Sequence, residues 1–185
     1  MLIEELGYHL AVCSILELEW FMKMDSDFWN VISIREPGMA RPPALRCAKS
    51  VHESLFEDRE VVDADFPCNP PRSEHLGAIL RFVDAHPGQP ILVHCVAGLS
   101  RSPAVALVVI IRGLLTLHPL TNQSVLVEKA VNLLIQIRAK SRPNCLVLQV
   151  GLEQFMLLDQ AMRLAIALMN HPVLFRNRSA GNARR

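Results

Sequence analysis

One stretch near the middle of the chain constrains the fold more than any other. The apolar run Ile91–Val93 predicts a buried strand that ends at His94 and Cys95. A short loop with one glycine follows, and the sequence Arg101–Leu115 predicts a helix. Pro103 would lie in the first turn of that helix, where a missing N–H is tolerated. The stretch therefore predicts a strand, a loop and a helix in succession.

The predicted loop is suited to binding an oxyanion. We expect its backbone N–H groups to form an anion-binding nest, with the positive end of the helix dipole behind them. Gly98 permits the backbone angles of such a loop, and the planar fork of Arg101 can hold two phosphate oxygens. The same positive field favours a thiolate at Cys95, which is an activated nucleophile. The predicted phosphate-binding residues are Val96, Ala97, Gly98, Leu99, Ser100 and Arg101.

The spacing of cysteine and arginine is specific to this loop. Of the five cysteines, only Cys95 has an arginine six positions later, and Ser102 follows that arginine. The run His94–Ser102 resembles the His-Cys-x5-Arg-Ser/Thr signature of the Cys-dependent protein tyrosine and dual-specificity phosphatases, in their small, single-domain, bacterial form. An arginine and a hydroxyl at a loop exit serve no apolar core, which argues against a purely structural cysteine.

The resemblance implies a phosphatase that forms a phosphocysteine on Cys95 and needs neither a metal nor a cofactor. Arg101 would hold the phosphoryl group, and Ser102 would donate a hydrogen bond to the Cys95 sulfur and ease its departure. His94 would hydrogen-bond the backbone near the loop and help to set the thiolate. In the sequence itself, no His, Cys or Asp cluster has metal-ligand spacing.

The leaving group of such a reaction needs a proton, which a carboxylic acid on a neighbouring loop can supply. The resemblance implies an aspartate upstream of the cysteine, on a loop just past a strand. We favour Asp58, because an acid pair directly after a predicted strand resembles related bacterial sequences and lies near the carboxyl edge of the sheet. Asp63 is the alternative, because its spacing is similar to that of many dual-specificity members. Asp58, Asp63 and Asp65 precede Cys95 by 37, 32 and 30 residues.

Predicted strands and helices alternate along the chain. The strands are predicted over residues 8–13, 28–34, 50–56 and from 90, and the helices over residues 16–24, 73–83, 101–115, 122–138 and 146–169. This order predicts an α/β fold with a central, mostly parallel sheet flanked by helices, similar to that of dual-specificity phosphatases. Cys95 would then lie at the carboxyl end of its strand, where such sheets bind ligands. We expect one phosphatase-like domain over residues 1–175 and a basic, frayed tail over residues 176–185.

Composition narrows the possible partners. The chain has 185 residues, of which 51% are hydrophobic, and this predicts a filled core and an apolar surface that a homodimer or another partner would use. The net charge of +1 gives no bulk field for nucleic acid. Irregularly spaced cysteines, with no signal peptide and no apolar run of bilayer length, predict a cytoplasmic protein without a membrane partner. A regulatory disulfide between Cys68 and Cys95 is chemically feasible, but an inert Cys68 is the simpler expectation.

The loop also bears on the substrate. Val96, Ala97 and Leu99 are uncharged, whereas a polyanionic ligand favours lysines. We therefore expect a phosphorylated protein, on tyrosine or with dual specificity. The alternatives are a phosphatase of a non-protein phosphomonoester, such as a phosphoinositide or an RNA end, and a silent phosphate-binding module of the same fold. The intact Cys95 argues against the silent module, because binding alone does not require a thiol.

Overall fold

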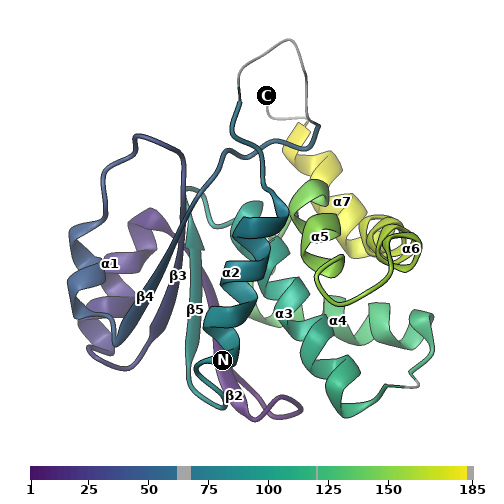
Figure 1. Ribbon diagram of the computed structural model, residues 1–185, viewed down its shortest axis with the longest axis horizontal. Coiled ribbons are helices and arrows are strands. Elements are labelled where there is room, and N and C mark those ends of the chain that lie inside the picture. Colours follow the sequence, from purple (N-terminus) through teal and green to yellow (C-terminus); the bar gives the residue numbers. More distant parts are fainter. Residues whose placement is uncertain (62–67, 120, 183–185) are drawn as a thin grey trace.

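The computed structural model describes residues 1–61, 68–119 and 121–182. Within them a five-stranded sheet forms the centre of the fold, with the strand order β1-β2-β5-β3-β4 (Figure 1). β1 pairs antiparallel with β2, and the other neighbours run parallel. The predicted α/β class with a mostly parallel sheet is therefore confirmed. The strands are β1 (Leu2–Ile3), β2 (Tyr8–Ser14), β3 (Asn30–Arg35), β4 (Ser50–Leu55) and β5 (Ile91–Cys95).

Helices cover both faces of the sheet, as Figure 1 shows with the sheet nearly edge-on. On one face, Leu18 of the first helix and Leu45 of a 3-10 helix cluster with Val31 of the sheet. The other helices lie on the opposite face around the larger core. The helical elements are α1 (Ile15–Met24), η1 (Pro43–Cys47), α2 (Ser73–Asp84), α3 (Arg101–Leu117), α4 (Gln123–Ile137), α5 (Cys145–Leu152), α6 (Leu158–Met169) and α7 (Pro172–Asn182).

β5 and α3 form the centre of the core. β5 is paired with β2 on one side and β3 on the other, and all five of its residues are buried, which explains its apolar run. α3 is buried along most of its length and contacts β2, β5, α4 and α5. Each fully buried valine, leucine or isoleucine there contributes ~1.5–3 kcal/mol. The loop between β5 and α3 is therefore held at both ends by core elements.

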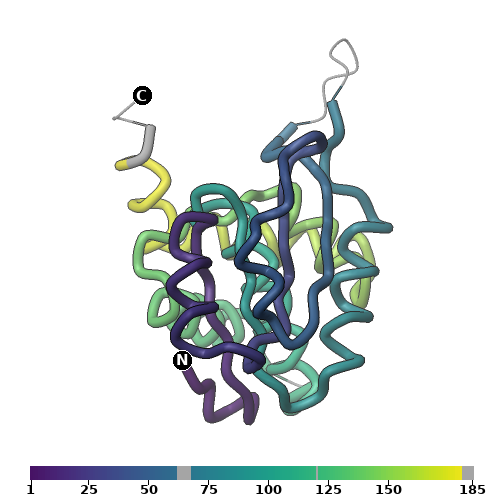
Figure 2. Tube along the Cα trace, turned by 90° about the vertical axis from the view of Figure 1, so that its left-hand side faces the viewer, coloured from purple at the N-terminus to yellow at the C-terminus, as the bar shows by residue number. Residues whose placement is uncertain are grey.

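The carboxyl ends of the parallel strands meet at one edge of the sheet. Figure 2 shows the segments after β3 and β4 leaving the sheet at this edge. Ser14 at the end of β2 and Cys95 at the end of β5 are register partners there. Parallel sheets bind their ligands at this edge, so a site built on the loop after Cys95 lies where the topology predicts it.

The sequence predicts one helix over residues 146–169, and this is wrong. The structure has two helices, α5 and α6, because the chain turns after Leu152 and Leu157 adopts an extended backbone conformation (φ −65°, ψ 144°) before α6 begins. In the turn between them, the side chain of Gln154 donates to Ser73 Oγ of α2. Phe155 and Met156 also pack on the core, so the apolar pattern continues across the turn and does not mark the break.

The expected frayed tail from Arg176 is replaced by helix as far as Asn182, and residues 183–185 lie outside the described part of the chain. Two polar side chains anchor this helix. Asn177 donates to the carbonyls of Ala139 and Ser141, and Arg178 pairs with Glu60. The polar, basic composition of this segment predicts fraying, because the contacts that hold it are made with residues far away in the sequence.

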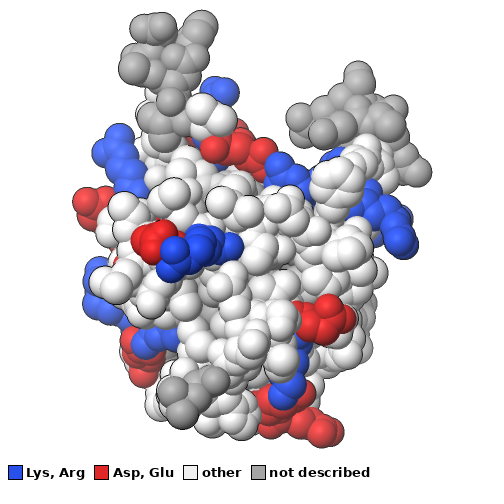
Figure 3. Space-filling model, turned by 90° about the vertical axis from the view of Figure 1, so that its right-hand side faces the viewer, with Lys and Arg blue, Asp and Glu red and all other residues white. Residues whose placement is uncertain are grey.

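The side of the molecule that carries α6 is poor in charge, as the space-filling view of Figure 3 shows. Leu158, Met162 and Ile166 are exposed at helical spacing along α6. This agrees with the apolar surplus of the sequence, and the homodimer or other partner that the surplus suggests stays a prediction. Among the described residues, no helix combines the length and the apolar character needed to cross a membrane.

Candidate active site

The loop from Val96 to Ser100 follows β5 and leads into α3. Three of its carbonyl groups accept hydrogen bonds from backbone N–H groups outside the loop. The Val96 carbonyl accepts from the Ile15 N–H at 3.1 Å, and the Leu99 carbonyl accepts from the Arg142 N–H at 2.7 Å. The Ser100 carbonyl accepts from the Asn144 N–H at 3.2 Å. In a trans peptide the next N–H points the opposite way, and the described residues contain no cis peptide. The N–H groups that follow these carbonyls therefore face the inside of the loop.

Arg138 supports the same loop from α4's C-terminal end. Its Nε donates to the Gly98 carbonyl at 3.2 Å, and its Nη1 donates to Glu17 Oε1 at 2.8 Å. The hydrogen bond from Arg138 Nη1 is the main cause that lowers the pKa of Glu17 to about 2. Glu17 also closes a capping box with Ser14 at the start of α1. The loop is thus tied to the first helix as well as to α3.

Cys95 lies at the base of the loop, with only 2% of its surface exposed. Its Sγ accepts hydrogen bonds from the Gly98 N–H at 3.3 Å and from Ser102 Oγ at 3.1 Å. Both donors stabilise negative charge on the sulfur. The expected contact between Ser102 and the Cys95 sulfur is present in the structure.

Gly98 is required by its backbone angle and by its surroundings. Its φ is +67°, and an added Cβ would lie 2.6 Å from the Cys13 carbonyl carbon and the Ser14 nitrogen. The loop therefore passes directly over the end of β2. Only glycine fits this close approach, because the contacted atoms are backbone and have no room to move aside.

Gly98→Ala is therefore expected to destabilise the fold and to disrupt the loop. The left-handed angle alone costs about 1–3 kcal/mol, and the backbone clash adds to it. Urea unfolding and calorimetric binding of tungstate measure the two effects. Gly88→Ala is the matched control, because Gly88 has a φ of +68° with open space around it. Equal losses in the two variants would contradict the role of the close approach.

Arg101 is almost completely buried at the exit of the loop, with 2% of its surface exposed. Its Nη1 donates to the Phe56 carbonyl at 2.6 Å, and its Nη2 donates to Glu36 Oε1 at 3.4 Å. Its Nε has no hydrogen-bond partner among the described residues. A buried, charged N–H without an acceptor is costly, so an external acceptor such as an oxyanion fits this position.

Asp58 follows the end of β4 and reaches the loop. Its Oδ1 accepts from Ser100 Oγ at 2.7 Å and from Asn144 Nδ2 at 2.8 Å. Its Oδ2 lies 4.0 Å from Arg101 Nε, and the side chain is 36% exposed. The carboxylate therefore lies beside the loop and in contact with solvent. Of the other candidate acids, Asp63 and Asp65 lie outside the described residues.

Asn144 is a site residue that the sequence reasoning missed. Its fully buried side chain donates to Asp58 Oδ1 and to the Arg59 carbonyl at 2.9 Å, and its Oδ1 accepts from the Val147 N–H to cap α5. An asparagine directly before a helix is an N-cap signal, which would have marked its backbone role. Its contact with Asp58 joins positions 86 residues apart and leaves no local signal.

His94 is fully buried in β5. Burial lowers its pKa from 6.5 to about 4, and the neighbouring Cys95 backbone opposes this shift only in part. The imidazole is therefore neutral near pH 7. The sequence predicts a hydrogen bond between the His94 ring and the backbone near the loop. In the structure, neither ring nitrogen of His94 has a hydrogen-bond partner of normal geometry among the described residues.

The neutral, buried His94 makes the protein sensitive to acid. Below about pH 6.5 the unfolded chain binds a proton at His94, whereas the folded chain does so only near pH 4. The contribution of the neutral His94 to the free energy of unfolding is therefore fully present above about pH 6.5. About 3 kcal/mol of it is lost as the pH falls toward 4. Urea unfolding at several pH values checks this. His94→Gln should show a smaller loss over the same interval, and the same loss in both proteins would contradict the assignment.

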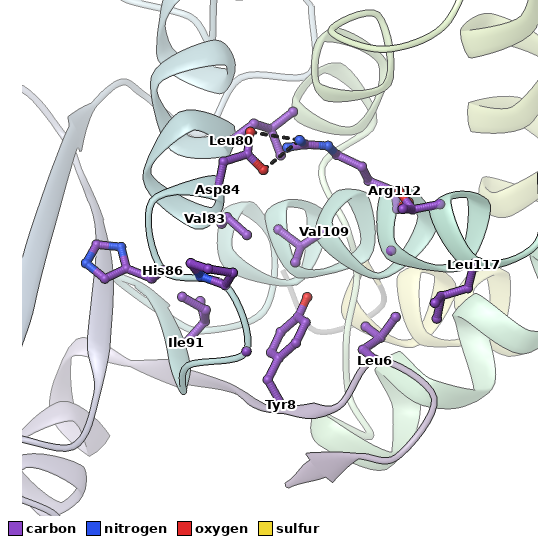
Figure 4. Close-up of a pocket in the computed structure, with 14 residues that line it drawn as sticks. Leu6, Tyr8, Leu80, Val83, Asp84, His86, Ile91, Val109, Arg112 and Leu117 are labelled. Atoms are coloured by element: carbon purple, nitrogen blue, oxygen red, sulfur yellow. Dashed lines mark hydrogen bonds and ion pairs between the residues drawn. The ribbon is translucent and has the colours of Figure 1, made fainter.

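A cleft of about 290 Å³ opens above the loop. It is lined by Asp58, Glu60, Ala97, Leu99, Ser100, Arg142 and Arg178. A second cavity, of about 350 Å³, lies elsewhere, between the start of β2, the end of α2 and the second half of α3 (Figure 4). Tyr8 points into it and Arg112 pairs with Asp84 beside it, and burial raises the pKa of Tyr8 to about 12. This second cavity contains none of the predicted site residues.

The described residues contain no group of three or more His, Cys, Asp or Glu side chains arranged to hold a metal ion. Their cysteines are all free thiols, Cys68 among them.

Comparison with known proteins identifies the fold. No protein-family model and no curated protein matches the chain. Among solved structures, human DUSP28 aligns with a TM-score of 0.52 and 18% identity, over 85% of this chain and 94% of that one. The PTP-2 phosphatase of Cydia pomonella aligns with a TM-score of 0.52 and 17% identity, over 78% and 84%. PTPMT1 in complex with PI(5)P aligns with a TM-score of 0.51 and 16% identity, over 86% and 93%. The chain therefore has the fold of the tyrosine and dual-specificity phosphatases.

Proposed function

We propose that the protein is a Cys-dependent phosphoprotein phosphatase, specific for phosphotyrosine or of dual specificity. The observation that carries the proposal is the buried Arg101, whose Nε lacks an acceptor beside a loop with inward N–H groups. A bound phosphate supplies acceptors to both, and Cys95 lies at the base of the same loop. The phosphatase-like fold supports this reading.

In the first step, the Cys95 thiolate attacks phosphorus and forms the S–P bond as the P–O bond to the substrate breaks. Arg101 and the loop N–H groups hold the non-bridging oxygens, where they stabilise the charge of the transition state. Asp58, in its protonated form, donates its proton to the leaving oxygen. The departing product is an alcohol or a phenol.

In the second step, a water molecule attacks the phosphocysteine. The Asp58 carboxylate accepts a proton from the water, the S–P bond breaks, and phosphate is released with the Cys95 thiolate. Ser102 and the Gly98 N–H donate hydrogen bonds to the sulfur, which makes it a better leaving group. The cycle restores both side chains and uses no metal or cofactor.

A non-protein phosphomonoester is the second candidate substrate. Arg142 lines the cleft beside the phosphate-binding loop, where its charge favours an anionic group beyond the scissile phosphate, whereas Arg178 in the same lining is paired with Glu60. PTPMT1, whose fold is similar, was crystallised with PI(5)P. These two observations make a phosphoinositide the specific alternative.

Turnover of phosphopeptides and inositol phosphates at equal concentration tests the substrate class. We expect higher kcat/KM for phosphotyrosine or mixed phosphopeptides. A strong preference for the inositol phosphates would move the assignment to the second candidate. If wild-type protein hydrolyses none of these and no p-nitrophenyl phosphate between mildly acidic and neutral pH, the chain is a silent phosphate-binding module.

A further inference from the structure

The C-terminal helix α7 is joined to both halves of the candidate site. Arg178 donates from Nη1 to Glu60 Oε1 and from Nη2 to Glu60 Oε2, each at 2.9 Å. The same Nη1 donates to the Pro143 carbonyl at 3.1 Å. We call residues 56–61, which contain Asp58 and Glu60, the acid loop, and residues 138–144 the support turn. The guanidinium of Arg178 therefore contacts both segments.

The support turn in turn holds the phosphate-binding loop. Its backbone N–H groups at Arg142 and Asn144 donate to the carbonyls of Leu99 and Ser100. The side chain of Asn144 reaches the acid loop, where it binds the Asp58 carboxylate and the Arg59 carbonyl. Asn144 therefore holds the side chain of Asp58 and the backbone of Arg59, and Arg178 holds the side chain of the next residue, Glu60.

The Arg178–Glu60 pair contributes little to global stability. The two side chains are 30% and 46% exposed, and solvent screens such pairs strongly. Its bidentate geometry nevertheless restricts the direction in which the acid loop can move. A misplacement of about 1 Å in a reacting group can lower a rate by about 10²-fold. A pair of this kind has a small effect on folding and a larger one on the placement of Asp58.

We propose that Arg178 is a positioning residue that holds the Asp58 carboxyl beside the leaving oxygen by fixing Glu60. The inference rests on the proposed function, in which Asp58 is the general acid. Arg178 acts through the acid loop and not through the phosphate.

Leaving-group dependence tests this role. Loss of proton donation slows a substrate with a poor leaving group, phenyl phosphate, far more than one with a good leaving group, 2,4-dinitrophenyl phosphate. Arg178→Ala is expected to lower kcat for phenyl phosphate by about tenfold, a fraction of the 10²- to 10⁴-fold that a general acid contributes. For the dinitrophenyl ester the expected loss is less than about twofold. Arg176→Ala on the exposed side of α7 is the matched control and should change neither rate.

Two further variants separate positioning from a general structural effect. In an Asp58→Asn background, Arg178→Ala should cause no further selective loss with phenyl phosphate, because the group that it positions is gone. The exchanged pair Arg178→Glu with Glu60→Arg should recover most of the rate that either single reversal loses. The urea unfolding midpoint of Arg178→Ala should match that of the wild type.

The outcomes are distinct. Equal losses with both esters, or an unchanged rate with phenyl phosphate, would overturn the positioning role while leaving the proposed function in place. If Arg178→Ala lowers the rate with phenyl phosphate as selectively in the Asp58→Asn background as in the wild type, the positioning role is also overturned. Wild-type protein that hydrolyses neither ester would overturn the proposed function, and the inference with it.

Discussion

Replacing Cys95 with serine is expected to abolish turnover and to leave oxyanion binding in place. The hydroxyl of serine is a far weaker nucleophile than a thiolate, so no phosphoenzyme forms at a useful rate. The binding groups remain, because the loop carbonyls and Arg101 are held by contacts that do not involve the sulfur, and among the loop N–H groups the one of Gly98 donates to it. Turnover of p-nitrophenyl phosphate and calorimetric titration with tungstate measure the two properties on the same protein.

Cys68→Ser is the control for this experiment, because Cys68 is a free, partly exposed thiol outside the loop. It should retain both activity and tungstate binding. Residual turnover in Cys95→Ser close to that of the wild type would exclude Cys95 as the nucleophile. Loss of tungstate binding in a folded Cys95→Ser protein would show that the sulfur itself, and not the amide ring, holds the oxyanion.

Asp58→Asn is expected to lower turnover of phenyl phosphate by about 10²- to 10⁴-fold, the usual contribution of a general acid. The amide retains an oxygen that accepts from Ser100 Oγ and Asn144 Nδ2, so the local structure should survive. What it loses is the ability to give a proton to the leaving oxygen and to take one from water. Steady-state kinetics with phenyl phosphate, with unfolding as a check on the fold, measures the effect.

Glu57→Gln is the matched control, because Glu57 is the neighbouring acid and pairs with Arg59 on the surface. Its turnover should stay within about twofold of the wild type. Asp63→Asn, measured beside it, decides between the two candidate acids. A large loss in Asp63→Asn together with a near-normal rate in Asp58→Asn would assign the general acid to Asp63.

The sequence was most informative where the physical signal is local. The apolar run of β5, the single glycine and the start of α3 follow one another in the chain, so the strand, loop and helix could be predicted together. Asp58 was predicted beside the loop because it directly follows β4, whose carboxyl end lies at the same edge as that of β5. The expected catalytic roles of these residues stay predictions.

Contacts between distant segments could not be predicted in the same way. Arg101 is oriented by the Phe56 carbonyl, 45 residues before it, and that contact exists only once β4 and β5 share a sheet. The two-residue strand β1 pairs with β2 but is too short to show a pattern. Arg178 belongs to a basic stretch that suggested a frayed tail, and only the fold brings it to Glu60.

The central claim is that phosphorus is transferred to the Cys95 sulfur within the loop. Rapid acid quenching of the wild-type protein during turnover of p-nitrophenyl phosphate, followed by mass spectrometry of its peptides, tests this claim most directly. We predict one added phosphoryl group on the peptide that contains Cys95, accumulating to a higher level in Asp58→Asn with 2,4-dinitrophenyl phosphate as substrate. A phosphoryl group on any other residue, or sustained turnover in Cys95→Ser with no labelled peptide, would contradict it.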